Sequence, residues 1–281
     1  MNAPATISEE ALPTGRYVQA GDVRLHLHDV GQGDRVVVFL HGSGPGASGW
    51  SNFDANARVL AAAGFRCLLP DLLGWGRSDK PTDRPYTMEV IGTALLAALD
   101  TLGVREVTLV GNSMGGALAI WLARHHAQRV EALVLMAPGG LEDRETYMGM
   151  KGIRSLARCL YGPEGLTREG MHLLFGKQVF DSALTPHDVI DLRYEVARTQ
   201  PLHVFQSLAV PNQADHLGEI TCPVLTLWGM DDQFCPVSGA RTIAERVPRG
   251  RVVLLGRCGH WVMVEHQAVF DRYLLDFLRH G

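Results

Sequence analysis

Short apolar runs alternate with longer amphipathic stretches along most of the chain. The apolar runs are rich in Val and Leu, which is typical of buried strands. They lie at residues 36–40, 67–69, 107–110, 132–136, 224–227 and 252–255. Helical patterns lie between or after them at residues 88–102, 116–125, 240–246 and 268–278. This alternation predicts an α/β fold, with a mainly parallel central sheet flanked by helices.

The alternation stops between about residues 141 and 216. This stretch is rich in helix formers, Met and Leu, and is punctuated at Gly162-Pro163 and Pro186. We therefore expect an inserted helical cap over the carboxyl edge of the sheet. The predicted organisation is a core formed by residues 1–140 and 217–281, with the cap at 141–216.

Composition and charge narrow the class of protein. Hydrophobic residues make up 46% of the 281 positions and the formal net charge is −4, which fits a globular unit with a sizeable core and no basic surface for nucleic acid. No apolar run approaches the roughly 18 residues of a membrane span. Residues 1–10 lack the basic-then-apolar pattern of a secretory signal. We expect a cytoplasmic protein without a nucleic-acid or membrane partner.

The cysteines give no sign of a disulfide framework or a metal site. There are five of them, an odd number, and they show neither C-x-x-C nor metal-ligand spacing. They are Cys67, Cys159, Cys222, Cys235 and Cys258. We expect reduced thiols and no bound metal.

The most informative pattern is Gly111-x-Ser113-x-Gly115. A strand-like run precedes it and a helical stretch follows it, so Ser113 is expected on a sharp strand-to-helix turn. A turn this tight leaves no room for a Cβ two residues before or after the serine, which explains both glycines. The pattern predicts that Ser113 is a nucleophile held up into an active site.

An acid and a histidine follow the serine in the chain order that such a fold uses. One strand-like run leads into the turn Gly229-Met230-Asp231-Asp232, and the last such run leads into a loop with His260. Asp231 is an alternative acid, but the Gly-x-x-Asp spacing favours Asp232. We expect His260 to take the proton of Ser113, while Asp232 fixes the imidazole tautomer and stabilises the imidazolium.

A glycine-rich turn at residues 41–46 follows the strand-like run 36–40. It is expected to bring backbone N–H groups close to the nucleophile. With the N–H of Met114, the turn around Ser43 then forms an oxyanion hole. We interpret His41, at the start of this turn, as a structural hydrogen-bonding residue rather than a base.

Three motifs together resemble the meta-cleavage-product hydrolases of the α/β-hydrolase superfamily. They are Ser43-Gly-Pro-Gly-Ala-Ser-Gly-Trp-Ser-Asn52, Gly111-Asn-Ser-Met-Gly-Gly116 and Cys258-Gly-His-Trp261, and the resemblance covers the chain from about Tyr17. It implies a serine-type hydrolase of bacterial aromatic catabolism. Such an enzyme cleaves the C5–C6 bond of a 2-hydroxy-6-oxohexa-2,4-dienoate to a 2-hydroxypenta-2,4-dienoate and a carboxylic acid. The resemblance also implies a small-molecule substrate, no cofactor, and a homo-oligomer, dimer or higher.

The resemblance places the substrate-binding groups as well. Those at the carboxylate end of the substrate are Asn52, Asn112, Arg193 and Trp261, and those in the loop beside the oxyanion hole are Ser43 and Gly44. Arg193 is the natural carboxylate clamp, because a planar guanidinium matches a carboxylate with two parallel hydrogen bonds. A solvent-exposed surface arginine is the alternative interpretation. Asn112 precedes the nucleophile, and its amide can both donate and accept.

Other functions remain open. A carboxylester or lactone hydrolase would use the same triad but needs no carboxylate clamp, and a non-catalytic receptor is disfavoured by the intact triad. Dehalogenases and epoxide hydrolases of the superfamily use an aspartate nucleophile, whereas position 113 is serine. The residues Val262-Met263-Val264 depart from the family's usual Ala and bulkier polar or aromatic residues, so the C6 substituent of the substrate stays open.

Overall fold

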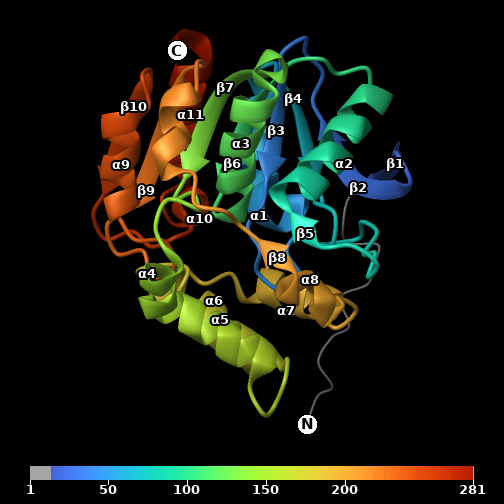
Figure 1. The fold of residues 1–281 in the computed structure, drawn as a ribbon, viewed down its shortest axis with the longest axis vertical. Coiled ribbons are helices and arrows are strands. Elements are labelled where there is room, and N and C mark those ends of the chain that lie inside the picture. The colour runs from blue at the N-terminus through green and yellow to red at the C-terminus, as the bar shows by residue number, and fades with distance from the viewer. Residues whose placement is uncertain (1–13, 281) are drawn as a thin grey trace.

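A central sheet organises the molecule. Within residues 14–280, the part of the chain that this computed structural model describes, the sheet has eight strands in the order β1-β2-β4-β3-β6-β7-β9-β10 (Figure 1). They are β1 (Arg16–Ala20), β2 (Val23–Val30), β3 (Val36–Leu40), β4 (Arg66–Pro70), β6 (Val107–Asn112), β7 (Val130–Met136), β9 (Val224–Gly229) and β10 (Gly250–Leu255). β2 pairs antiparallel with β1 and β4, and the other neighbours are parallel. The carboxyl ends of β3, β6, β7, β9 and β10 therefore meet at one edge.

Helices cover both faces of the sheet. Val38 and Leu40 of β3 belong to one core cluster, and Val37 and Phe39 belong to the other, because successive side chains of a strand point to opposite faces. The helices on the first cluster are α2 (Met88–Thr101), α3 (Met114–His125) and α9 (Ser238–Arg246). Those on the second are α1 (Gly49–Ala62) and α11 (Gln267–His280). The α/β architecture predicted from the apolar periodicity is confirmed.

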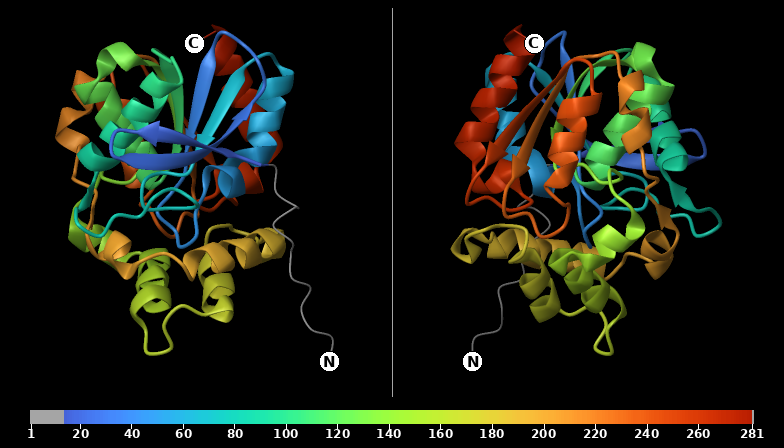
Figure 2. Two further views of the ribbon diagram at one scale, coloured as in Figure 1. Left: turned by 90° about the vertical axis from the view of Figure 1, so that its right-hand side faces the viewer. Right: turned by 60° about the vertical axis from the view of Figure 1, so that its left-hand side comes forward.

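Residues 141–216, called the helical segment below, hold most of the remaining helices. These are α4 (Arg144–Gly149), α5 (Lys151–Tyr161), α6 (Arg168–Phe175), α7 (His187–Ala197) and α8 (Leu202–Gln206). Figures 1 and 2 show them gathered below one end of the sheet, apart from the helices that cover its faces. The strand β8 (Leu208–Ala209) pairs with β5 (Tyr86–Thr87) and joins the segment to the core.

Short elements complete the chain. They are the 3₁₀ helices Ala127–Arg129, Ser182–Leu184 and Ala214–Glu219 and the helix α10 (Val262–Glu265).

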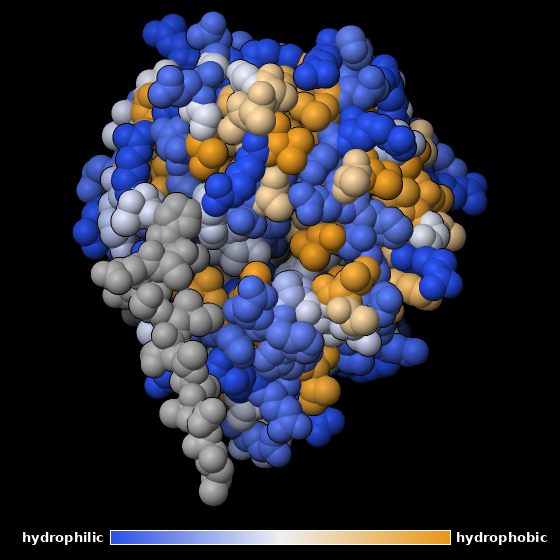
Figure 3. Space-filling view, turned by 180° about the vertical axis from the view of Figure 1, so that it is seen from behind, coloured by the Kyte–Doolittle hydropathy of each residue, from blue (hydrophilic) through white to orange (hydrophobic). Residues whose placement is uncertain are grey.

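On the face seen in Figure 3, apolar residues lie in small groups between polar ones.

All five cysteines are free thiols, as their spacing predicts. Among residues 14–280, no helix is both long enough and apolar enough to cross a membrane. Residues 1–10, where the sequence lacks a secretory-signal pattern, lie outside the described part.

Candidate active site

Ser113 lies on the turn between β6, which ends at Asn112, and α3, which begins at Met114. Its backbone angles are φ 56° and ψ −118°, a conformation that residues other than glycine rarely adopt. A Cβ at Gly111 would lie 2.5 Å from the carbonyl oxygen of Gly115, and one at Gly115 would lie 2.0 Å from that of Leu40. The two glycines are thus required sterically, as the pattern predicts.

His260 and Asp232 form a buried pair. His260 follows β10, Asp232 follows β9, and the imidazole Nδ1 lies 2.7 Å from the Asp232 Oδ2. The other carboxylate oxygen accepts the backbone N–H groups of Phe234 (2.7 Å) and Cys235 (3.0 Å). Because an ionised carboxylate only accepts, Nδ1 carries a proton and Nε2 is left as the nitrogen that can accept one. The alternative acid, Asp231, is exposed.

A small cavity of about 40 Å³ brings the sequence-predicted residues together. Those that line it are Ser43, Gly44, Asn52, Asn112, Ser113, Arg193, His260 and Trp261. Asp232 lies behind His260, and Met114, whose side chain is buried in the core, adjoins the nucleophile as the first residue of α3. The structure therefore gathers side chains from the core and from the helical segment around one point.

The glycine-rich turn lies beside the nucleophile, since a Cβ at Gly42 would be 3.3 Å from the Cβ of Ser113. His41 holds this turn in place. Its Nε2 accepts the N–H of Leu72 (3.0 Å) and its Nδ1 donates to the carbonyl of Gly42 (2.8 Å). Burial lowers the pKa of His41 to about 4, so the imidazole is neutral. His41 is a structural residue, as the sequence predicts.

Arg193 enters the cavity from α7 and is 2% exposed. Its Nη1 donates to Asn52 Oδ1 (3.0 Å), and its guanidinium carbon lies 4.5 Å from the ring centre of Phe175 and 5.3 Å from that of Trp261. Its Nε has no hydrogen-bond partner, and no carboxylate pairs with it among residues 14–280. Burial lowers the pKa of this guanidinium. Burying a cation without a counter-ion is costly, so an anion in the cavity would stabilise Arg193.

Asn112 has structural hydrogen bonds beside its place in the cavity wall. The sequence places it among the substrate contacts, and it does line the cavity. Its Nδ2, however, donates to the backbone carbonyls of Met136 (3.2 Å) and His260 (3.3 Å). In this arrangement the amide ties the loop of His260 to the end of β7.

Sequence reasoning missed several residues of the cavity wall. They are Ile153, Leu156, Leu174, Gln178 and Phe234. The Phe234 ring lies 5.1 Å from the His260 ring at an angle of 31°, and its place two residues after Asp232 is a signal that could have found it. The others come from the helical segment, where no motif marks them.

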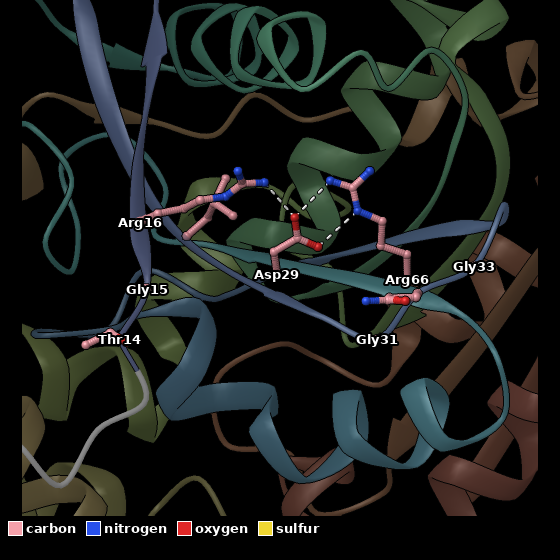
Figure 4. Close-up of a pocket in the computed structure, with 9 residues that line it drawn as sticks. Thr14, Gly15, Arg16, Asp29, Gly31, Gly33 and Arg66 are labelled. Atoms are coloured by element: carbon pink, nitrogen blue, oxygen red, sulfur yellow. Dashed lines mark hydrogen bonds and ion pairs between the residues drawn. The ribbon is translucent and has the colours of Figure 1, made fainter.

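A second hollow lies at the β1–β2–β4 side of the sheet (Figure 4). In it, Asp29 Oδ2 binds Arg16 Nη2 (2.7 Å) and Arg66 Nη2 (2.8 Å), and Asp29 Oδ1 accepts from Arg66 Nε (3.0 Å). Both oxygens of this carboxylate are thus taken up by guanidinium groups. The hollow is a surface ion-pair cluster, and its described lining residues include no nucleophile with a base.

Comparison with known proteins places the chain in a family. The family model described as alpha/beta hydrolase fold matches residues 35–267. A 2-hydroxy-6-oxononadienedioate/2-hydroxy-6-oxononatrienedioate hydrolase from Cupriavidus pinatubonensis is 39% identical over 94% of this chain and 95% of that protein. A 2-hydroxy-6-oxo-6-phenylhexa-2,4-dienoate hydrolase from Burkholderia cepacia is 35% identical over 98% and 96%. The solved structure of a meta-cleavage product hydrolase from Pseudomonas fluorescens has a TM-score of 0.83, with 28% identity over 94% of this chain and 97% of that one. The chain therefore belongs to the meta-cleavage-product hydrolases of the α/β-hydrolase fold.

Proposed function

We propose that this enzyme hydrolyses the C5–C6 bond of a 2-hydroxy-6-oxohexa-2,4-dienoate, releasing a 2-hydroxypenta-2,4-dienoate and a carboxylic acid. The observation that carries the proposal is Arg193, a buried cation without an acidic partner among residues 14–280, in the cavity that Ser113 and His260 share. A ring-fission dienoate supplies both the carboxylate for Arg193 and a ketone for Ser113. An ordinary ester supplies only the carbonyl.

The proposed reaction begins with the substrate carboxylate on the guanidinium of Arg193, beside Asn52. A C–C bond breaks heterolytically only if the departing carbon can spread its electrons. Ketonisation of the dienol provides this: the 2-hydroxyl group loses its proton and C5 gains one. The electrons of the C5–C6 bond can then move toward the new C2 ketone when the bond breaks.

The nucleophilic steps follow the logic of a serine triad. Ser113 Oγ attacks C6 while His260 Nε2 takes its proton, and the backbone N–H groups of Ser43 and Met114 stabilise the oxyanion. When the C5–C6 bond breaks, the dienolate leaves and takes the proton from His260. Water then attacks the acyl-enzyme with His260 as base, the carboxylic acid departs, and the proton returns to Ser113.

We further propose that the helical segment, residues 141–216, is a cap over this reaction, with 1–140 and 217–281 as the core. It supplies Arg193 and the aliphatic wall of the cavity, so the core alone would hold a triad without a carboxylate receptor. From the resemblance noted above, we propose that the enzyme acts in the cytoplasm as a homo-oligomer.

The test compares a dienoate with a neutral ester. Loss of the yellow dienolate colour reports C–C cleavage, and p-nitrophenyl acetate reports the triad alone. We expect Arg193→Gln to lower kcat/KM for the dienoate by on the order of 10²-fold, because a charge-assisted partner is lost. Ester hydrolysis should change by less than about threefold, because the nucleophile, base and oxyanion donors are untouched.

Ser113→Ala is the control that should abolish both activities. Equal losses on both substrates in Arg193→Gln would mean that the arginine holds the helical segment in place. Unchanged kcat/KM on both substrates would mean that no substrate carboxylate binds at Arg193. Either result would favour a carboxylester or lactone hydrolase over the proposed function.

A further inference from the structure

Gln178 is a polar side chain on the cavity wall to which the reaction above assigns no role. It lies between α6 and the 3₁₀ helix Ser182–Leu184 and is 7% exposed. Its backbone N–H donates to the carbonyl of Phe175 (2.9 Å), and its carbonyl accepts the N–H of Trp261 (2.9 Å). A Cβ at Gly259 would lie 2.6 Å from that same carbonyl oxygen. The side chain of Gln178 therefore leaves a backbone that is fixed against the loop of His260.

The amide of Gln178 is incompletely bonded. Its Oε1 is buried and has no hydrogen-bond partner, although the side chain lines the same cavity as Ser113 and His260. Burying such a group without a partner destabilises a folded protein. A buried acceptor on a residue that lines a cavity is explained if a ligand completes its bonding.

Two other buried glutamines show what a structural role looks like in this chain. Gln200 accepts the N–H of Gly46 (3.1 Å) and donates to the carbonyl of Gly74 (2.8 Å). Gln213 donates to the carbonyl of Ala117 (3.0 Å) and accepts from Arg124 (3.3 Å). In both, each end of the amide is satisfied by protein groups. Gln178 differs from them in its Oε1, which has no protein partner.

Among the other polar groups of the cavity, Asn112 bonds backbone carbonyls, and the groups used in the reaction have partners in the substrate. Arg193 and Asn52 take the C1 carboxylate, and Ser113, His260 and the glycine-rich turn take the C6 ketone. What remains for the C6 substituent is a wall of three aliphatic side chains and one aromatic ring, together with Gln178. That wall consists of Ile153, Leu156, Leu174 and Phe234.

We propose that Gln178 is a specificity-determining residue that contacts the C6 substituent and favours a hydrogen-bonding tail, such as one ending in a carboxylate, over an aryl tail. This inference rests on the proposed function. The Gln178 amide can present its N–H to a carboxylate or its carbonyl to a hydroxyl group by turning about its last bond. An aryl tail offers neither partner and would leave the buried amide unsatisfied, which is the situation in which a site discriminates most strongly.

The names of the relatives include both kinds of tail. The hydrolase from Cupriavidus pinatubonensis is named for a nonadienedioate, which has a second carboxylate, and that from Burkholderia cepacia for a 6-phenyl dienoate. The identities of 39% and 35% are too close to choose between them. Gln178 gives a physical reason to expect the dioate class.

The experiment measures kcat/KM for 2-hydroxy-6-oxononadienedioate and for 2-hydroxy-6-oxo-6-phenylhexa-2,4-dienoate. The variant is Gln178→Met, which keeps the length of the side chain and removes the amide. We expect wild-type enzyme to prefer the dioate, and the variant to lower the dioate-to-phenyl ratio by about tenfold or more. Because Oε1 gives up no protein hydrogen bond, the Tm of the free variant should stay the same or rise.

Gln213→Met is the matched control. It removes a buried glutamine amide that is satisfied and remote from the cavity lining, so it should lower Tm and leave the substrate ratio unchanged. A ratio that Gln178→Met alters by less than about twofold, or a fall in Tm as large as that of Gln213→Met, would overturn the inference. If wild-type enzyme cleaves neither dienoate, the proposed function fails and this inference fails with it. Cleavage of both with an insensitive ratio overturns the inference alone.

Discussion

At the scale of single residues, backbone strain gathers around the candidate site. Within residues 14–280, the non-glycine residues with positive φ are Ser113 (56°), Ala137 (41°) and Arg257 (53°). Each follows a strand of the parallel sheet at its carboxyl end, after β6, β7 and β10 respectively. Such conformations persist only where the surrounding structure imposes them. The strain thus marks the edge at which the serine and the histidine loop meet.

The two adjacent aspartates should behave differently. Asp232→Asn is expected to lower kcat by about 10³-fold or more, because an amide cannot stabilise the imidazolium of His260 and can present N–H to Nδ1, which selects the wrong tautomer. Asp231→Asn should leave kcat within about twofold, because its side chain is exposed and surface changes have small effects. Steady-state assays with p-nitrophenyl acetate check this. The opposite ranking would move the acid to Asp231.

His41 should make the free energy of unfolding depend on pH. Its pKa is lowered by burial from 6.5 to about 4, so the unfolded chain binds a proton between these pH values and the folded one does not. Stability from this site is therefore fully present above pH 6.5 and is lost as the pH falls toward 4. Between pH 7 and pH 5, the contribution of His41 to the free energy of unfolding should fall by about 2 kcal/mol.

Urea unfolding of wild-type enzyme and His41→Gln at these two pH values measures this effect. The variant should be less stable at pH 7 and should lose about 2 kcal/mol less than wild type on going to pH 5. An equal acid dependence in both proteins would show that His41 is protonated in the folded state.

At the scale of elements, the core was predictable because its local signals agree with one another. The strand at 107–110 and the helix that follows flank a turn whose glycines are sterically required, so pattern and packing specify the same structure. The same holds for His260, which lies on the loop that follows the apolar run 252–255. The hairpin β1–β2 and the helix α1 escaped prediction. α1 begins with a capping box, in which Ser48 and Ser51 bond reciprocally. The residues after it include Asn and Asp among the apolar ones, so the sequence shows only a weak apolar stripe at helical spacing.

The cavity wall was less predictable, because tertiary packing chooses its residues. Arg193 was expected only through a resemblance, and its periodicity in α7 gives no hint that it is buried. Gln178 lies outside any helix or strand, and what brings it to the site is a backbone hydrogen bond with Trp261, 83 positions further along the chain. No local pattern encodes a pairing of that kind. The triad follows from strand ends, whereas the substrate-facing residues depend on how the helical segment docks.

At the scale of the whole molecule, the closed arrangement must open for substrate. The cavity of about 40 Å³ is far smaller than the roughly 300–1,000 Å³ of a small-molecule site. Hydrogen bonds hold the helical segment to the core at several points, among them Gln200 and Glu265. Gln200 bridges the backbones of Gly46 and Gly74. Entry of a dienoate therefore requires some of these contacts to separate.

A second set of hydrogen bonds between the segment and the core centres on Glu265. We call this set the Glu265 clasp. Its carboxylate accepts the backbone N–H groups of Phe180 (2.8 Å) and Asp181 (2.9 Å) from the helical segment and that of Gly259 (2.7 Å) from the loop of His260. One charge thus binds the segment and the catalytic loop together. Three N–H donors converge on it, which a neutral amide with a single acceptor oxygen cannot satisfy.

Glu265→Gln should loosen this clasp without unfolding the sheet. Hydrogen bonds to a charged group contribute roughly 1.5–3 kcal/mol, so amide hydrogen exchange at Phe180 and Asp181 should accelerate by at least about tenfold through local opening. Exchange in the buried strand β7 is the internal control and should not change. Faster exchange in β7 as well would indicate global destabilisation. Unchanged exchange at both amides would mean that the Glu265 clasp does not limit opening of the helical segment.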